Sequence, residues 1–211
     1  MKLFLLTYLS PAASPSVISV QRPSLRPSFS GAGVAAVCRS SVHAASAATA
    51  LALGWQAELL MVIGTAGKIA PIDGDCFVID EAVQSDYGAQ RADAFAHFTA
   101  GSWPIGEAIL APFRAMDLPD IGLPKARIAT GDSFVECPAH GARLADALGA
   151  ALVDMETGAV AQIAHKIGLP WAAIKAASDD ANEGSAGDFM TNFRAAADRA
   201  ARAAEKAIAA L

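Results

Sequence analysis

Two adjacent aspartates follow an apolar stretch in the last fifth of the chain. Ile174 to Ala177 has the composition of a buried strand, and Ser178, Asp179 and Asp180 come directly after it, at the start of a loop rich in Gly, Ser and Asn. A carboxyl group sheltered at a strand end can serve as a general acid, because burial favours its protonated form. Neighbouring acids in a loop are also common as solvated surface charges. The pattern therefore poses a choice between a proton donor and two ordinary loop residues.

Three other predicted strands also end in residues that could bind a small molecule. These strand ends are Gly64 to Gly67, Thr130 to Phe134, and Asp154 to Glu156. In α/β sheets the ligand site usually lies outside the carboxyl ends of the strands. We expect the three segments to meet the loop that carries Asp179.

Each of these residues also has an ordinary structural interpretation. Asp154 stands at a strand-to-helix junction, where an aspartate is a natural N-cap, and Glu156 suits the first turn of a helix because of the helix dipole. Phe134 and Met155, taken singly, are typical core residues, and Gly64 to Gly67 could be only a tight turn. A functional interpretation depends on the joint order of the segments along the chain.

Short apolar runs alternate with Ala-rich or amphipathic runs, which is typical of an α/β sheet covered on both faces. A helix cap is expected at Gly54, and Ser185 with Asp188 resembles a capping box. We expect an irregular, Pro-rich segment over 1–30 and one domain over 30–211. Strands are predicted at 4–9, 16–20, 58–63, 76–83, 126–130, 151–153 and 171–177, and helices at 34–53, 107–116, 143–148, 156–167 and 185–211.

Composition excludes several classes of function. The 211 residues carry 16 basic and 21 acidic side chains, a formal net charge of −5, without a basic run, which argues against a nucleic-acid partner. Charged residues, Gly or Pro interrupt every apolar stretch before the roughly 18–20 residues that a membrane span needs. Cys38, Cys76 and Cys137 are widely spaced and the histidines are scattered, so we expect no disulfide, no metal site and a reducing, cytoplasmic compartment.

Five short motifs in order resemble the purine nucleoside phosphorylase and nucleosidase superfamily, most closely the 5′-methylthioadenosine/S-adenosylhomocysteine nucleosidases. The resemblance covers roughly residues 30 to 211. The motifs, followed by the segment Lys175 to Asp179 in place of the family's RAISD, are Ser30 to Gly33 (SGxG), Gly64 to Gly67 (GSAG), Gly74-Asp75 with Asp80-Glu81 (GD and SDE), Thr130 to Phe134 (SGDxF), and Val153 to Glu156 (VEME).

The resemblance implies a fold and a reaction. The fold would be a mainly parallel or mixed sheet flanked by helices, and the reaction would be hydrolysis of the N-glycosidic bond of an adenine nucleoside. Asp179, aimed by Ser178, would protonate the departing purine, while Phe134 would stack on the base and the Val135 backbone would pair with its edge. No cofactor is implied.

The same resemblance assigns the sugar side of the site. Glu156 would accept both ribose hydroxyls, Met155 would pack against the sugar, and Thr65 and Gly67 would let the main chain approach the ribose and the attacking oxygen. Lys175 stands where the family has an arginine that orients water, which replaces a fork of donors by a point charge. A homodimer is implied, with the partner chain closing the 5′ side of the pocket.

The chain departs from the family near its beginning. The family's water-activating glutamate after the first strand has no counterpart, because Glu58 is the first carboxylate side chain and the corresponding turn reads Tyr8 to Pro11. The alternatives are a hydrolase that uses another acid, a slow enzyme in which protonation of the leaving group works without the base, and a protein with an atypical or altered N-terminus that is impaired or only binds nucleosides.

A phosphate-dependent phosphorylase is a further alternative. In that class an arginine two residues before the glycine loop holds phosphate, and here Val62 fills the position. Arg39 or Arg91 could replace that arginine, although water is the expected nucleophile because valine offers a dianion no donors.

Overall fold

The structure, a computed structural model, describes residues 3–7, 34–38 and 40–211. The strand predicted at 16–20, the motif Ser30 to Gly33 and most of the atypical segment 1–30 lie outside the described residues. The strand predicted at 4–9 is confirmed as β1 (Leu3–Thr7).

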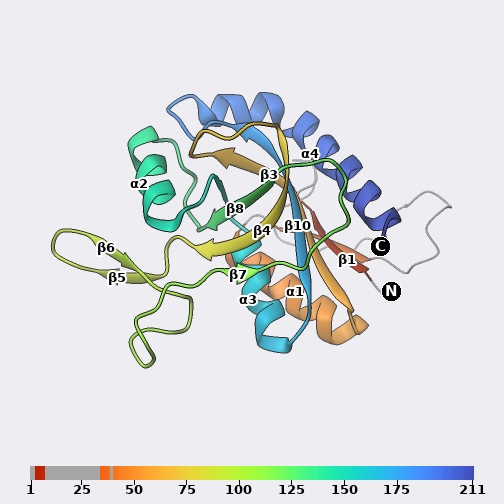
Figure 1. The fold of residues 1–211 in the computed structure, drawn as a ribbon, viewed down its shortest axis with the longest axis horizontal. Coiled ribbons are helices and arrows are strands. Elements are labelled where there is room, and N and C mark those ends of the chain that lie inside the picture. The colour runs from red at the N-terminus through yellow and green to blue at the C-terminus, as the bar shows by residue number, and fades with distance from the viewer. Residues whose placement is uncertain (1–2, 8–33, 39) are drawn as a thin grey trace.

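A mixed sheet runs through the centre of the molecule and helices pack on both of its faces, which confirms the predicted α/β class (Figure 1). A small hairpin of β5 (Gly88–Gln90) and β6 (Phe95–His97) projects from one side. The other strands are β2 (Val34–Val37), β3 (Leu59–Lys68), β4 (Cys76–Gln84), β7 (Phe113–Arg114), β8 (Lys125–Thr130), β9 (Leu152–Asp154) and β10 (Trp171–Asp179). The helices are α1 (Ser41–Trp55), α2 (Pro138–Leu148), α3 (Thr157–Ile167) and α4 (Ser185–Ala209).

The sheet closes on itself at its centre. Its strand order is β10-β4-β8-β9-β3-β1-β2, and β10 also pairs with β3, so β3, β10, β4, β8 and β9 form a ring of hydrogen-bonded neighbours. The β10–β3, β4–β8 and β8–β9 pairs are parallel, whereas β10–β4 and β3–β9 are antiparallel. This closure brings the ends of β3, β8, β9 and β10 together.

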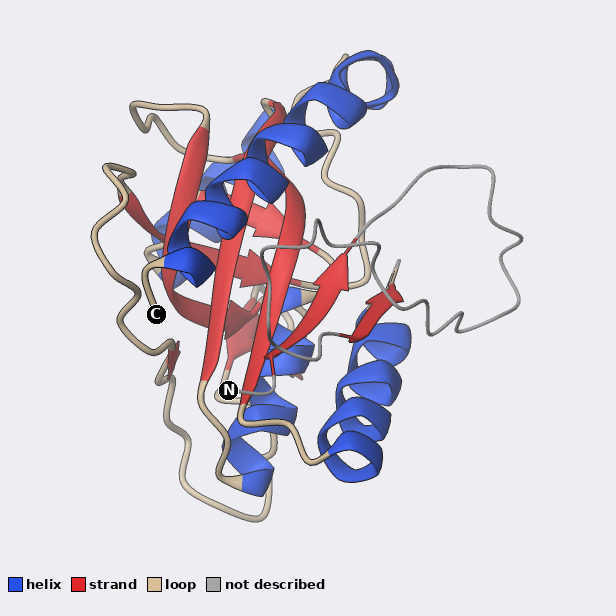
Figure 2. Ribbon diagram, turned by 90° about the vertical axis from the view of Figure 1, so that its right-hand side faces the viewer, coloured by secondary structure: helices blue, strands red, loops and turns tan. Residues whose placement is uncertain are grey.

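The two faces of β3 belong to two different hydrophobic clusters. Leu59, Met61 and Ile63 pack with the small alanines of α4 on one side, while Leu60 and Val62 pack with α1 and α3 on the other. Figure 2 shows α4 lying along one side of the strands. Successive side chains of a strand point to opposite faces, so a strand covered on both faces must be apolar throughout. Residues 59–63 meet that requirement, and a strand predicted from their composition is confirmed.

The helix predicted at 34–53 is wrong in its first third. Val34–Val37 is strand β2, hydrogen-bonded in parallel to β1, and helix α1 begins only at Ser41. Ser40 caps this helix by accepting a hydrogen bond from His43 N at 3.4 Å. The cap at the other end is Gln56 in the left-handed conformation (φ 53°) rather than Gly54.

Two further predictions are corrected. The stretch 107–116 is not a helix, because Phe113–Arg114 instead pairs with Glu81 and Ala82 at the edge of β4. Helix α4 begins at Ser185 as predicted, but its N-cap is Gly184 and no side chain caps it, so Ser185 and Asp188 do not form a capping box. The helices and strands predicted over 126–183 are confirmed with shifts of a few residues, the largest being α2, which begins at Pro138.

Candidate active site

Four strand ends meet at one cavity, as the sequence predicts. The cavity has a volume of about 380 Å³. It is lined by Thr65, Ala66 and Gly67 from β3, Ser133, Phe134 and Val135 after β8, Val153, Asp154, Met155 and Glu156 at the end of β9, Ser178 and Asp179 at the end of β10, and Ala186, Phe189 and Met190 from α4.

Asp179 is held in the wall of this cavity. Asp179 is only 9% exposed, whereas Asp180 is exposed to solvent. Ser178 Oγ donates to Asp179 Oδ2 at 2.8 Å, and the Ala181 N–H donates to Asp179 Oδ1 at 3.1 Å. These two donors fix the orientation of the carboxyl group, and Asp179, unlike Asp180, is buried and lines the cavity.

Gly67 is the residue that lets Asp179 approach β3. A Cβ atom at position 67 would lie 2.8 Å from Asp179 Oδ1 and 3.3 Å from Val153 Cγ1. Contacts below 3 Å require a shift of the surrounding atoms, and both neighbours belong to paired strands. A glycine at position 67 is therefore required by the packing of β3 against the Asp179 carboxylate.

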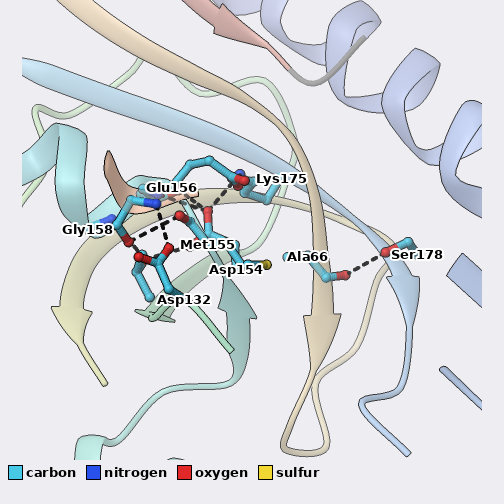
Figure 3. Close-up of polar contacts among 11 residues, drawn as sticks. Ala66, Asp132, Asp154, Met155, Glu156, Gly158, Lys175 and Ser178 are labelled. Atoms are coloured by element: carbon cyan, nitrogen blue, oxygen red, sulfur yellow. Dashed lines mark hydrogen bonds and ion pairs between the residues drawn. The ribbon is translucent and has the colours of Figure 1, made fainter. Parts of the chain in front are cut away.

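A buried lysine lies behind the sugar side of the cavity. Lys175 is 2% exposed, and its Nζ lies 2.7 Å from Asp154 Oδ2 and 3.6 Å from Glu156 Oε2. Figure 3 shows the Lys175 side chain reaching from β10 toward both carboxylates at the end of β9. Lys175 is not one of the residues that line the cavity, whereas Glu156 and Asp154 are.

Both carboxylate oxygens of Asp154 have partners. Besides Lys175, Asp154 accepts hydrogen bonds from Thr130 Oγ1 at 2.5 Å, from the Thr157 N–H at 3.0 Å and from the Thr157 hydroxyl. Three of the four donors, the Lys175 ammonium and both Thr157 groups, lie on Oδ2, and Thr130 donates to Oδ1. The N-cap of α3 is Glu156, so the N-cap predicted at Asp154 is wrong, although the Asp154 side chain still accepts a hydrogen bond from the first N–H of the helix.

The ionisation of Glu156 is perturbed. Burial raises the pKa of the Glu156 carboxyl to about 7, the Lys175 ammonium opposes this rise, and the Asp154 carboxylate adds to it. Burial alone would lower the pKa of Lys175, but Asp154 and Glu156 outweigh it and the pKa is raised, so this lysine is charged at neutral pH. A carboxyl group that titrates near neutrality in a cavity wall is typical of a functional site.

The remaining walls are apolar and partly open. Phe134 is 45% exposed and Met190 is 64% exposed, and the Phe134 ring meets the Phe189 ring edge-on with centroids 5.9 Å apart. Sequence reasoning did not find Ala186, Phe189 and Met190, because nothing in the first two turns of an Ala-rich helix indicates that it faces a ligand. The only available signal was a Phe-Met pair shortly after the Asp179 loop.

The predicted site residues lie in or behind the wall of this cavity. Eight line the cavity, whereas Lys175 lies behind its wall; the eight are Thr65, Gly67, Phe134, Val135, Met155, Glu156, Ser178 and Asp179. Asp80 and Glu81 of the predicted GD and SDE motifs do not line this cavity, and Glu81 forms an ion pair with Arg127. In the described part of the chain, no three His, Cys, Asp or Glu side chains group as a metal site, and no helix is long and apolar enough to cross a bilayer.

The chain is similar in sequence to known proteins. Residues 25–209 match the Phosphorylase superfamily, and the chain belongs to that family. It is 29% identical to a 5′-methylthioadenosine/S-adenosylhomocysteine nucleosidase of Mycobacterium bovis, over 74% of this chain and 72% of the relative. It is 30% identical to the protein of the same name from Anoxybacillus flavithermus, over 74% of this chain and 71% of the relative.

Solved structures share the fold. A futalosine hydrolase of Helicobacter pylori superposes with a TM-score of 0.79 at 19% identity, covering 100% of this chain and 98% of that one. A 5′-methylthioadenosine/S-adenosylhomocysteine nucleosidase of the same organism, bound to butyl-thio-DADMe-Immucillin-A, gives a TM-score of 0.76 at 20% identity with the same coverage. At this identity the likeness concerns the fold, and the resemblance to the nucleoside phosphorylase and nucleosidase superfamily is confirmed.

Proposed function

We propose that the protein hydrolyses the N-glycosidic bond of an adenine nucleoside that carries a 5′-alkylthio group, of the methylthioadenosine or S-adenosylhomocysteine type. The observation that carries the proposal is that Asp179 and Glu156, the predicted proton donor and the predicted ribose ligand, line the same cavity. The names of the similar proteins, all nucleosidases, support the same reaction class.

The chemistry follows from the charges that develop as the bond breaks. Positive charge builds on the ribose and negative charge on the departing purine, so the site must protonate the base and hold the sugar. Asp179 would donate its proton to the purine, oriented by Ser178, while Phe134 would stack on the base and the Val135 backbone would pair with its edge. Glu156 would accept hydrogen bonds from the ribose hydroxyls beside Met155, in a charge-assisted arrangement.

The nucleophile would enter beside the end of β3. Thr65 and Gly67 line the cavity there. Val62 is 2% exposed and packs in the cluster beneath α1 and α3, so its position offers a phosphate no donor. The apolar side chain at position 62 favours water over phosphate as the nucleophile. A phosphorylase is therefore only the second candidate function.

The experiment is a single assay of base release. Pure protein is incubated with methylthioadenosine, S-adenosylhomocysteine, adenosine, inosine and futalosine, each with and without phosphate, and free base is followed with time. We expect release from the 5′-alkylthio adenine nucleosides without phosphate. Release that needs phosphate would identify a phosphorylase, release from futalosine alone would reassign the substrate, and binding without turnover would identify a non-catalytic relative.

The proposal includes a homodimer in the cytoplasm. The exposed apolar side chains of Phe134 and Met190 at the cavity support a partner chain that closes the 5′ side. The free thiols of Cys38, Cys76 and Cys137 support a reducing compartment. Light scattering at micromolar concentration would report the mass of two chains if the dimer forms.

A further inference from the structure

Lys175 occupies an unusual position for a charged residue. It is 2% exposed in the middle of the hydrogen-bonded strand β10, and such a burial is costly unless the charge is paired. Its partners are the carboxylates of Asp154, the last residue of β9, and Glu156, the N-cap of α3, at 2.7 Å and 3.6 Å from Nζ. The three groups carry one excess negative charge when all are ionised.

The two carboxylates differ in what they can still do. Asp154 receives four donors, from Lys175, Thr130 and Thr157, three of them on Oδ2 and one on Oδ1, with the Lys175 Nζ at 2.7 Å. Glu156 makes a longer contact with Lys175, at 3.6 Å, and lines the cavity. Asp154 is therefore suited to fixing the lysine, and Glu156 to meeting a ligand.

We propose that Lys175 is the counter-ion of Glu156, and that Asp154 is a positioning residue that holds the Lys175 ammonium behind Glu156. The ammonium lies behind the cavity wall and reaches a reacting atom only through Glu156. This inference rests on the proposed function only where it takes Glu156 as the ribose ligand. The charge relation among the three side chains can be tested without any nucleoside.

Within the part of the chain that the structure describes, the other titratable groups around Glu156 do not supply this counter-charge. Cys38, just beyond β2, is buried, and burial together with the Glu156 carboxylate raises the pKa of its thiol to about 12, so it is neutral. Asp179 lines the same cavity and carries no positive charge. Among the described residues, Lys175 is the cation paired with Glu156.

The arrangement predicts two shifts of opposite sign. Lys175→Met removes a positive charge that favours the ionised carboxylate, so the midpoint of the Glu156 titration rises from about 7. Asp154→Asn removes a negative charge that disfavours the carboxylate, so the midpoint falls. Charges within ~4–6 Å commonly move a pKa by one pH unit or more, and we expect at least about that change in each direction.

The measurement is the titration of the Glu156 side chain by ¹³C NMR in protein labelled at the Glu carboxyl carbon, without substrate. Glu156→Gln assigns the resonance by removing it. Lys175→Arg keeps the charge and should keep the midpoint within a fraction of a pH unit. Asp146→Asn, an exposed carboxylate on α2, is the control for a distant charge and should leave it unchanged.

The outcomes separate this inference from the proposed function. Opposite shifts support the counter-ion arrangement whether or not the protein cleaves nucleosides. Unchanged midpoints in both variants, or shifts of the same sign, overturn it even if base release proceeds as proposed. Asp154→Asn keeps the test decisive if Lys175→Met fails to fold, because a midpoint that stays or rises in Asp154→Asn contradicts the arrangement.

A second readout concerns binding. If Glu156 grips the ribose as an anion, KM should rise as pH falls through the Glu156 midpoint, and this limb should move to lower pH in Asp154→Asn. The KM values of Asp154→Asn and the parent should converge at high pH, where Glu156 is ionised in both. A purely structural role of Asp154 would instead raise KM or lower kcat by the same factor at every pH, and that result refutes the positioning role.

Discussion

Replacing Asp179 by asparagine tests the proposed proton donor with little change of shape. The structure indicates that the fold tolerates the change. The Asn carbonyl can accept from the Ala181 N–H in place of Oδ1, and the amide NH₂ can donate to Ser178 Oγ in place of Oδ2. What the amide cannot do is give a proton to the purine.

The expected loss follows from what general acid catalysis contributes. Proton transfer by a positioned side chain is typically worth ~100- to 10,000-fold, or about 3–5.5 kcal/mol at 1.36 kcal/mol for each factor of ten. We expect the rate constant for base release by Asp179→Asn to fall within that range. Substrate affinity should change far less, because the hydrogen bonds of the ground state are preserved.

Asp180→Asn is the matched control, because it removes the same charge one residue away. Asp180 is exposed, and surface charges contribute at most about 1 kcal/mol, so its rate constant should fall less than about fivefold. The assay is single-turnover release of adenine from methylthioadenosine, with thermal unfolding of each variant as a check on folding. Comparable losses in the two variants would refute the choice of Asp179.

Three other substitutions test the surrounding structure. Gly67→Ala places a methyl group 2.8 Å from Asp179 Oδ1, so we expect a displaced carboxyl and a fall in kcat of roughly 100-fold; an unchanged kcat would contradict the close packing. Phe134→Ala should raise KM about 5- to 30-fold, from a stacking energy of ~1–2 kcal/mol, with little change in the unfolding midpoint because Phe134 is 45% exposed. Phe77→Ala removes a side chain that is 0% exposed and should lower the free energy of unfolding by about 3–5 kcal/mol in urea titrations, while the folded fraction keeps its specific activity.

The strand ends were predictable because their composition changes abruptly. Leu60 to Ile63 and Ala172 to Ile174 are apolar on both faces, as expected for strands buried on both sides. The first run stops at Gly64, and the second strand ends, after Lys175 and two alanines, at Ser178 and Asp179, where such strands open onto a ligand site. The sequence therefore indicates which segments form the site before any tertiary contact is known. It also distinguishes β10 from α4 by the loop between them.

Other elements could not be predicted because a partner far away in the chain decides their conformation. Val34–Val37 is a strand because β1 supplies its hydrogen bonds, although the Ala-rich run that follows favours a helix. Phe113–Arg114 is a strand because it pairs with the edge of β4. The four donors around Asp154 come from three separate segments, and no local pattern indicates that Lys175 is one of them.

The pairing register of the closed sheet determines where Asp179 and Asp154 lie relative to one another. Asp179 is paired with Gly67 across β10 and β3, Gly67 is paired with Val153 across β3 and β9, and Asp154 is paired with Thr130 across β9 and β8. The proposed proton donor thus lies across Gly67, whose missing side chain makes room for it, from the end of β9 that carries Asp154. A slip of any of these strands by one residue would turn its functional side chain to the opposite face. The hydrophobic faces of β3, which fix its register against α4 and against α1 and α3, therefore also fix the geometry of the site.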